Sequence, residues 1–585
     1  MSFRFFILFS FILLQEFCFS KNIRVKTTYG CIIGKESKNF RSVTEFLGIP
    51  FAQPPVGILR FKAPKPLKKN YYGKKCFKAT TPANTCYFNR ESTGFKGIDD
   101  WQPQSLKMSE NCLQLNMWVP KNKTGAVIIF INGNSYRMGS PSLKFYDGSM
   151  LASFNGTIVI NINYRLGVLG FAYMLGGYLV PGNMGLLDQQ MAIKWVYDNI
   201  ESFGGNKSMI TLFGHGAGSS SATAHMFSEG SKPYFSRIVA ASGTILNKWA
   251  IEYNKENVDE NFRRLMRRLR CFTRDDFYLL RCMQRQRVLK LVIEADKIFN
   301  LKQTILKYPF LPIDGDNLFF NGFIVKMLRY GFFKKNVDIV IGKIFDEASL
   351  FMPFYFSKKK YGFNLNLYKS MNSQANECRI DSRQYENIVR LITRDQQLHH
   401  DAVDEIIFNY GHLKELNYRD KAIRIVSDFG FDCDIVRFAR KIGHYIKGNK
   451  YLYEFEVRST QTPFPLWMGL VHGYELLYFF GHPFTNSLKY KKGYLKYEQY
   501  FSFHAMEMLS MFANKGKLHN NWLQYTNKFM CMAVFDDNYK VNNKFKIRYA
   551  NTKECLNVKS IYQYYRIRAL RRYRSDYPAN KNDPE

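Results

Sequence analysis

The 585-residue chain lacks the features that would divide it or place it in a special class. No Gly/Ser/Pro-rich linker, internal repeat or low-complexity tract interrupts it, which favours one large domain. Beyond the N-terminal segment, no run reaches the roughly 18 apolar residues that a membrane-spanning helix needs, so no membrane span is expected. No Cys-x-x-Cys pair or His/Cys cluster is present, so neither a metal nor a cofactor is expected.

Acidic residues are scarce relative to basic ones. The chain has 48 Asp and Glu against 84 Lys and Arg, a formal net charge of +36, which favours anionic partners. The alternative is a coding bias toward Lys that leaves only a solvated basic surface. If residues 263–270 are helical, five arginines form a dense ridge that would bind anions: Arg263, Arg264, Arg267, Arg268 and Arg270.

The N-terminus predicts secretion. Residues 1–20 have one positive charge, an apolar run and small residues at the end, typical of a signal peptide. We expect the main domain at 21–560 and a basic C-terminal tail at 561–585, too polar for a lipid-anchor signal. Ten cysteines follow the signal peptide, an even number that favours disulfides in an oxidising compartment. Three glycosylation sequons begin at Asn122, Asn155 and Asn206.

Alternating patterns predict an α/β fold with a mostly parallel central sheet flanked by helices. Residues 126–131 and 157–163 are short apolar runs rich in β-branched residues, typical of strands buried on both faces. Residues 187–203 have apolar side chains at helical spacing, and a Gly-Gly pair follows. Residues 337–341 and 451–455 predict two further strands.

A serine is missing where the sequence around it predicts one. An apolar strand at 209–213 leads into Gly214-His215-Gly216-Ala217-Gly218. This pattern is typical of the nucleophile elbow, G-x-S-x-G, in which a sharp turn lifts the serine above the sheet at the start of a helix. Gly216 leaves that position without a side chain. Ser219 and Ser220 would lie a turn into the helix and are expected to point away.

Several further blocks resemble the type-B carboxylesterase and cholinesterase family. They are FLGIPFA at 46–52, PPVG at 54–57, LRF at 59–61, SENCLQLN at 109–116, NYRLG at 163–167 and GNMGLLDQ at 182–189. The resemblance implies an α/β-hydrolase fold over about residues 26–555. It also implies three disulfides: Cys86 with Cys112, Cys271 with Cys282, and Cys433 with Cys555. It assigns no pairing to four cysteines: Cys31, Cys76, Cys378 and Cys531.

The same resemblance assigns roles in a serine-hydrolase site. Glu347 matches the family's triad acid and His472 its triad base. The oxyanion loop departs from the family, because Asn134 and Ser135 replace two glycines and should twist or fill the hole, while Ala217 keeps its identity.

The resemblance also extends to a ligand position. Trp101 resembles the tryptophan on which cholinesterases hold quaternary ammonium groups. His215 stands where cholinesterases usually have an acid, and a protonated imidazole there would repel a cation.

These residues predict a secreted, catalytically inactive protein that acts by binding. The serine-less elbow is similar to that of the neuroligins, which are adhesion proteins. The expected partner is a protein or an acidic glycan at a cell surface; nucleic acid is not expected for a secreted chain. Two alternatives remain open: a weak ester hydrolase in which His472 activates water, and sequestration of a small cationic ligand near Trp101.

Overall fold

The computed structural model describes residues 23–576 apart from 74, 103, 300–304, 538 and 540–543. The expected signal peptide therefore lies outside the described residues.

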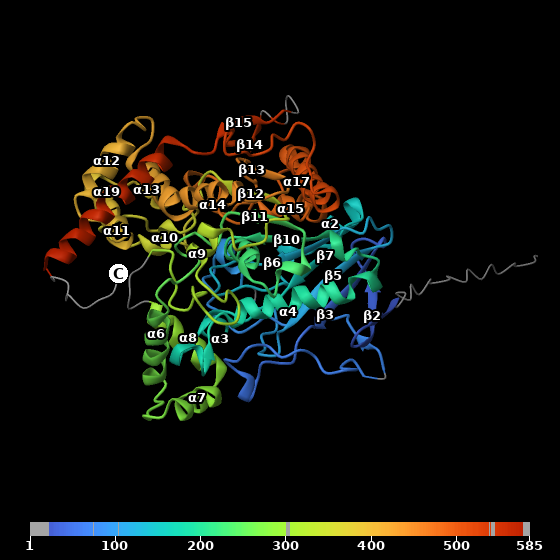
Figure 1. Ribbon diagram of the computed structural model, residues 1–585. Helices are drawn as coiled ribbons and strands as arrows, with labels where there is room; N and C mark the ends of the chain where they lie inside the picture. Colours follow the sequence, from blue (N-terminus) through green and yellow to red (C-terminus); the bar gives the residue numbers. More distant parts are fainter. Residues whose placement is uncertain are drawn as a thin grey trace, which may run out of the picture.

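A large mixed sheet forms the centre of the molecule (Figure 1). Seven neighbouring strands are parallel: β7 (Ile158–Ile162), β6 (Val127–Ile131), β10 (Ile210–His215), β11 (Arg237–Ala241), β12 (Asp338–Ile344), β13 (Lys450–Phe455) and β14 (Cys531–Phe535). Antiparallel strands flank them on both sides: β1 (Ile23–Thr27), β2 (Gly30–Glu36), β3 (Val43–Pro50), β5 (Gln114–Pro120) and β15 (Lys546–Tyr549). The short strand β4 (Phe77–Lys78) pairs with β2, and β8 (Tyr173–Met174) and β9 (Val180–Pro181) form a separate two-stranded sheet. The predicted fold class is confirmed.

The parallel strands are apolar throughout because each face of the sheet contacts its own core. Along β6, Val127, Ile129 and Ile131 enter one core, whereas Ile128 and Phe130 enter the other. Helix α4 (Met184–Asn199) packs in the first core, and helices α2 (Ser149–Asn155) and α17 (Leu495–Lys515) pack in the second. The predicted helix 187–203 thus corresponds to α4 and the 3-10 turn Ile200–Phe203 that follows it.

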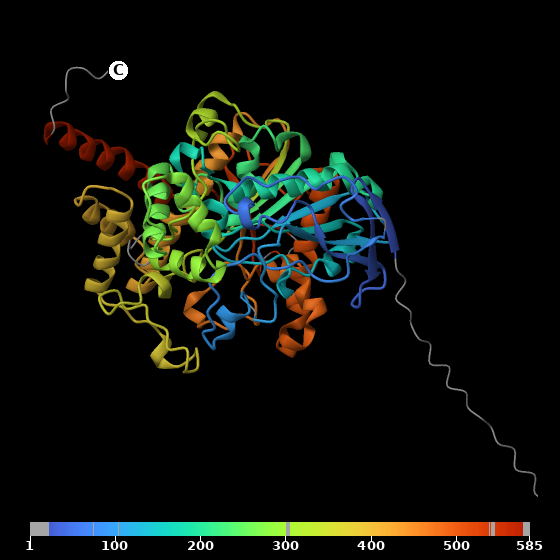
Figure 2. The same cartoon turned by 90° about the horizontal axis from the view of Figure 1, so that it is seen from below.

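Further helices follow the strands, and several of them gather at one end of the molecule (Figure 1). The longer ones are α5 (Ala217–Ala224), α6 (Lys255–Arg268), α7 (Asp276–Arg285), α8 (Val288–Phe299), α11 (Ser382–Asp395), α12 (Ala402–Gly411), α13 (Tyr418–Ser427), α14 (Cys433–Gly443) and α19 (Lys553–Asp576). The shorter ones are α1 (Lys96–Asp99), α3 (Gly167–Phe171), α9 (Ile324–Tyr330), α10 (Met352–Tyr355), α15 (Leu476–Phe479) and α16 (His482–Thr485). Helix α19 crosses the expected boundary at 560/561 and extends beyond the body of the molecule (Figure 2). Among the described helices, none is both long and apolar enough to cross a membrane.

Four disulfides hold the fold together. The three that the family resemblance implies are all present, at Cys86–Cys112, Cys271–Cys282 and Cys433–Cys555. A fourth joins Cys31 to Cys76, whose partners the sequence left open. Cys378 and Cys531 remain as free thiols, and burial raises the pKa of the Cys378 thiol to about 11.

Candidate functional site

The elbow is built as its sequence predicts, except for the nucleophile. Strand β10 ends at His215, and α5 begins at Ala217. The flanking glycines are obligatory, because a Cβ on Gly214 would lie 2.1 Å from the Gly218 carbonyl oxygen, and one on Gly218 would lie 1.9 Å from that of Ile131. Gly216 has φ 55° and ψ −118°, a backbone conformation that glycine adopts with least strain.

The matched acid and base meet directly above this turn. His472 Nδ1 lies 2.7 Å from Glu347 Oε2, and Glu347 is fully buried. The second carboxylate oxygen of Glu347 accepts a hydrogen bond of 3.0 Å from the amide of Ile344. A Cβ placed on Gly216 would lie 3.0 Å from His472 Nε2 and would touch no other side chain. The imidazole therefore faces the space that a nucleophile would fill.

A second histidine–carboxylate pair adjoins the first. His215 Nε2 lies 2.7 Å from Glu475 Oε1, and both side chains are buried. Burial lowers the pKa of His215, but the charge and hydrogen bond of Glu475 outweigh it and raise the pKa above 6.5. Burial likewise raises the pKa of Glu475, and His215 outweighs it and holds this pKa below 4.5. The charge of His215, expected to repel cations, is therefore balanced by Glu475.

Neither nearby serine can replace the missing nucleophile. Ser219 Oγ donates a 2.5 Å hydrogen bond to the carbonyl of Gly243, and Ser220 Oγ accepts one of 2.8 Å from the Tyr136 hydroxyl. Both serines are fully buried. Their hydroxyls therefore point into the protein.

The loop after β6 keeps a glycine-type backbone without the glycines. Asn134, Ser135 and Tyr136 all have positive φ, at 70°, 57° and 58°. Such angles cost about 1–3 kcal/mol each in residues other than glycine. Asn134 and Ser135 both line the cavity above the elbow, at positions where the family's glycines carry no side chain.

The elbow opens into a cavity of about 490 Å³. It lies at the carboxyl ends of the parallel strands, where open α/β sheets bind ligands. Its lining combines polar residues with a set of aromatic ones that includes Trp101, Trp249, Phe351, Phe354, Tyr355 and Phe431. The Trp101 ring also packs against Phe145, Tyr146 and Tyr474 at 4.9–6.2 Å between centroids.

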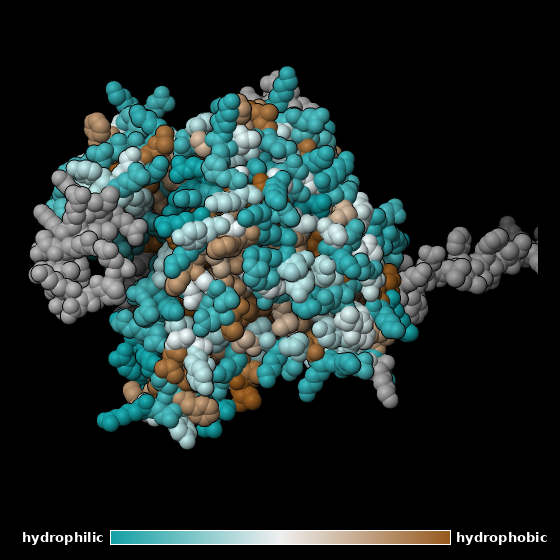
Figure 3. All heavy atoms as spheres, viewed as in Figure 1, coloured by the Kyte–Doolittle hydropathy of each residue, from teal (hydrophilic) through white to brown (hydrophobic). Residues whose placement is uncertain are grey.

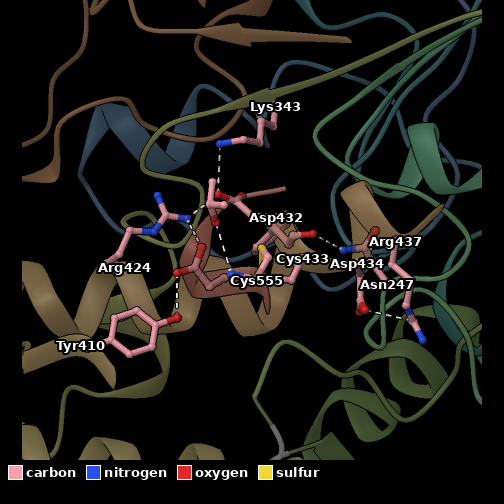
Figure 4. The surroundings of a disulfide bond; sticks show 12 residues. Asn247, Lys343, Tyr410, Arg424, Asp432, Cys433, Asp434, Arg437 and Cys555 are labelled. Carbon is pink, nitrogen blue, oxygen red and sulfur yellow. Dashed lines mark hydrogen bonds and ion pairs between the residues drawn. A yellow bond between two sulfur atoms is a disulfide. The ribbon is translucent and has the colours of Figure 1, made fainter. Parts of the chain in front are cut away.

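One wall of the cavity depends on a buried ionic cluster that the sequence did not reveal. Phe431, whose ring lies 5.3 Å from that of His472, belongs to a π-helical turn, Asp428–Asp432. Asp428 accepts hydrogen bonds of 2.7 Å from Tyr410 and Arg424, and Asp432 pairs with Lys343 at 3.1 Å (Figure 4). The neighbouring Cys433–Cys555 disulfide ties this turn to α19.

The five arginines at 263–270 were expected to form a dense anion-binding ridge, but only some of them are free of ion pairs with neighbouring carboxylates. Arg263 pairs with Asp259 and Asp276 at 2.8 and 3.0 Å. Arg264 pairs with Glu260, and Arg268 pairs with Glu294. The carboxylates thus balance three of the five guanidinium groups; Arg267 and Arg270 are exposed.

The three sequons lie together, away from the cavity. Asn122, Asn155 and Asn206 are exposed, and their loops precede β6, β7 and β10. Backbone hydrogen bonds link the loops, from Thr124 to Gly156 and from Asn206 to Gly125. Glycans at these positions would leave the cavity mouth free.

Comparisons with known proteins agree with this architecture. The model of the carboxylesterase family matches residues 21–553. The chain is 34% identical to a cholinesterase of Mus musculus over 503 residues, 83% of this chain and 76% of that protein. It is 32% identical to acetylcholinesterase 4 of Caenorhabditis briggsae over 87% of this chain and 84% of that protein. It is 34% identical to an acetylcholinesterase of Bungarus fasciatus over 77% and 71%.

Proposed function

We propose that this chain, which belongs to the carboxylesterase family, acts by binding and not by catalysis. The observation that carries the proposal is the elbow, where Gly216 presents no nucleophile to the His472–Glu347 pair. Loss of the nucleophile costs a serine hydrolase roughly a factor of a million in turnover. Each lost oxyanion donor costs about a hundred to a thousand, and Asn134 and Ser135 disturb that loop as well.

A fluorophosphonate tests the proposal directly. The purified protein is incubated with the reagent, adducts are mapped by mass spectrometry, and ester hydrolysis is followed in the same samples. We expect no stoichiometric adduct at any serine, and no activity that the reagent abolishes. A heat-unfolded sample is the control for unspecific labelling. An adduct at one serine, formed in step with loss of activity, would overturn the proposal.

A weak ester hydrolase is the alternative from the enzyme class. In it His472 would activate a water above Gly216, with Glu347 holding the imidazole at 2.7 Å. Such an activity would resist fluorophosphonates and disappear in His472→Gln. Hydrolysis with both properties would favour this alternative over binding.

We further propose that the protein is secreted and glycosylated at Asn122, Asn155 and Asn206. Four disulfides favour an oxidising compartment, and all three asparagines are exposed. Expression in a secreting cell, followed by glycosidase treatment and mass spectrometry, tests both. Retention of the chain in the cytosol would contradict the proposal.

The partner we favour is an acidic glycan or protein at a cell surface. Six exposed cations of α6–α8 and their connections have no ion pair within the described part of the chain: Arg267, Arg270, Arg274, Arg285, Arg287 and Lys290. Hydrophobic side chains interrupt the hydrophilic surface over the same end, where Figure 1 places α7 (Figure 3). Phe272, Phe277 and Tyr278 are 73%, 50% and 65% exposed.

Binding to an acidic glycan is tested by the salt concentration at which the protein elutes from immobilised heparin. Arg267→Gln with Arg270→Gln and Arg274→Gln should elute earlier than the unmodified chain, because the local potential falls. Replacing Lys358, Lys359 and Lys360, an exposed cluster elsewhere, removes the same charge. Equal shifts would show an unspecific effect of net charge.

Sequestration of a small cationic ligand is a second candidate, since Trp101 lines the cavity. It predicts binding of choline-like ligands that Trp101→Ala abolishes. The packing of Trp101 against three aromatic rings also gives it a purely structural role, which a loss of stability in the same variant would reveal.

A further inference from the structure

The space above Gly216 contains a hydrogen-bond acceptor that has no partner in the described part of the chain. A carboxylate only accepts, so the 2.7 Å contact with Glu347 assigns the proton to Nδ1 of His472. In the neutral imidazole Nε2 then carries a lone pair. This atom lies 3.0 Å from the Cβ that Gly216 does not have. A group that fills the space must therefore donate a hydrogen bond to Nε2.

A donor lies beside the same space. Ala217, which lines the cavity, is the first residue of α5, and amides in the first turn of a helix have no intrahelical partner. The filling group should thus accept as well as donate, as a hydroxyl does.

The charged groups nearest His472 are paired, which favours a ligand that is neutral where it contacts this residue. His215 is balanced by Glu475 at 2.7 Å, and Arg137 by Asp296; the carboxylate of Glu91, elsewhere in the lining, has no ion pair among the described residues. Glu347 is held by His472 and by the amide of Ile344. A carboxylate ligand would bring a second negative charge toward buried Glu347, and a quaternary ammonium has no proton to donate to Nε2.

The walls favour an apolar, flat body. Trp249 and Phe431, which both line the cavity, pack together with ring centroids 5.5 Å apart, and Phe351 lies 5.3 Å from His472. A cavity of about 490 Å³ is within the range that takes drug-sized ligands.

We propose that the cavity binds an apolar alcohol or phenol whose hydroxyl occupies the place of the absent serine hydroxyl. This hydroxyl donates to His472 Nε2 and accepts from the Ala217 amide. Its apolar body lies against the aromatic walls. The inference rests on the proposed binding function and names the ligand class of that same site.

The test compares 2-naphthol with 2-methoxynaphthalene, which has the same rings but no hydroxyl proton. Binding is measured by calorimetry and by the fluorescence of Trp101 and Trp249, which line the cavity. We expect 2-naphthol to bind about tenfold more tightly, because the ether leaves Nε2 unpaired. Equal affinities would overturn the proposal, as would tighter binding of 2-naphthoate or of a naphthyl trimethylammonium ion.

Two glycine variants locate the hydroxyl. Gly216→Ala places a methyl group 3.0 Å from Nε2, so the preference for 2-naphthol should disappear while 2-methoxynaphthalene still binds. Gly57→Ala is the matched control, because Gly57 also has positive φ but nothing within 4 Å of its Cβ position. It should keep the full preference. An unchanged preference in Gly216→Ala would place the hydroxyl elsewhere and overturn the assignment.

Turnover of 2-naphthyl acetate separates this inference from the function on which it rests. Turnover with a stoichiometric fluorophosphonate adduct overturns the binding function, whatever the affinities are. No turnover and no preference for the hydroxyl overturns only the ligand assignment.

Discussion

His215 and Glu475 form a buried ion pair, with Nε2 and Oε1 2.7 Å apart, at the floor of the cavity. The His215 ring also lies 4.5 Å, centroid to centroid, from that of His472. Two histidines, each held by its own carboxylate, therefore lie side by side next to the empty nucleophile position. Because Glu475 balances the charge of His215, this imidazole does not place an unpaired positive charge beside His472.

This pair predicts a pH dependence of stability. The pKa of His215 is raised, so its stabilisation is complete below 6.5 and is lost as pH rises through the folded-state pKa. The pKa of Glu475 is lowered, so its stabilisation is complete above 4.5 and is lost as pH falls through the folded-state pKa. The pair should therefore stabilise the fold most between pH 4.5 and 6.5.

The variant Glu475→Gln tests this dependence. We expect it to lower the free energy of unfolding by about 3–5 kcal/mol at pH 5.5, because a buried charge loses its partner. The loss should shrink toward pH 9, because rising pH removes the proton from His215. Urea unfolding at both pH values measures it. As a control, Glu229→Gln removes the exposed partner of Lys232 and should cost under about 1 kcal/mol. A loss in Glu475→Gln that does not change with pH would contradict the predicted pH dependence.

Restoring the serine alone should not restore an esterase. In Gly216→Ser, the Cβ lies 3.0 Å from His472 Nε2 and the backbone keeps φ 55°. This strain should cost about 1–3 kcal/mol of stability. We expect little hydrolysis of p-nitrophenyl acetate, because Asn134 and Ser135 still occupy the oxyanion loop.

Adding Asn134→Gly and Ser135→Gly to Gly216→Ser should raise kcat by about a hundredfold or more if the loop then regains a donor. The same two glycines without the serine are the control and should stay inactive. High activity in Gly216→Ser alone would show that the loop already stabilises an oxyanion.

Those parts of the fold and of the site that depend on local sequence patterns or on family motifs could be predicted from the sequence. The buried strands, the elbow and three disulfides follow from runs of apolar residues or from matched segments. The ion pair of His215 was missed, although Glu475 lies only three residues beyond His472, because a carboxylate 260 positions away gives a lone histidine no signal. The π-helical turn that carries Phe431 was missed because the i,i+4 pair of Arg424 and Asp428 is equally typical of an ordinary α-helix, and the other cation, Lys343, lies far away in the sequence.

The cluster behind that turn should be costly to break. Lys343 pairs with Asp432 and Glu454, and all three side chains are buried. Lys343→Met should lower the free energy of unfolding by up to about 3–5 kcal/mol, because Asp432 and Glu454 each lose one of two cations and keep only Arg424 and Arg548, respectively. Lys194→Met removes the exposed partner of Asp198 and should cost at most about 1 kcal/mol. Urea unfolding of both variants measures these losses in the free energy of unfolding. Similar losses would show that the buried cluster stabilises the fold no more than a surface ion pair does.

The disulfides should differ in their contributions because they close loops of different length. Cys433–Cys555 spans 122 residues and Cys271–Cys282 spans 11. In the chain-entropy model, these loops correspond to about 4.9 and about 2.8 kcal/mol. Replacing both members of each pair by alanine and measuring unfolding in urea should show the larger loss for Cys433 and Cys555. That variant should also weaken binding of any cavity ligand, because the bond anchors the turn that carries Phe431. A smaller loss than at Cys271 and Cys282 would mean that the ionic cluster holds α19 and the turn in place without the covalent bond.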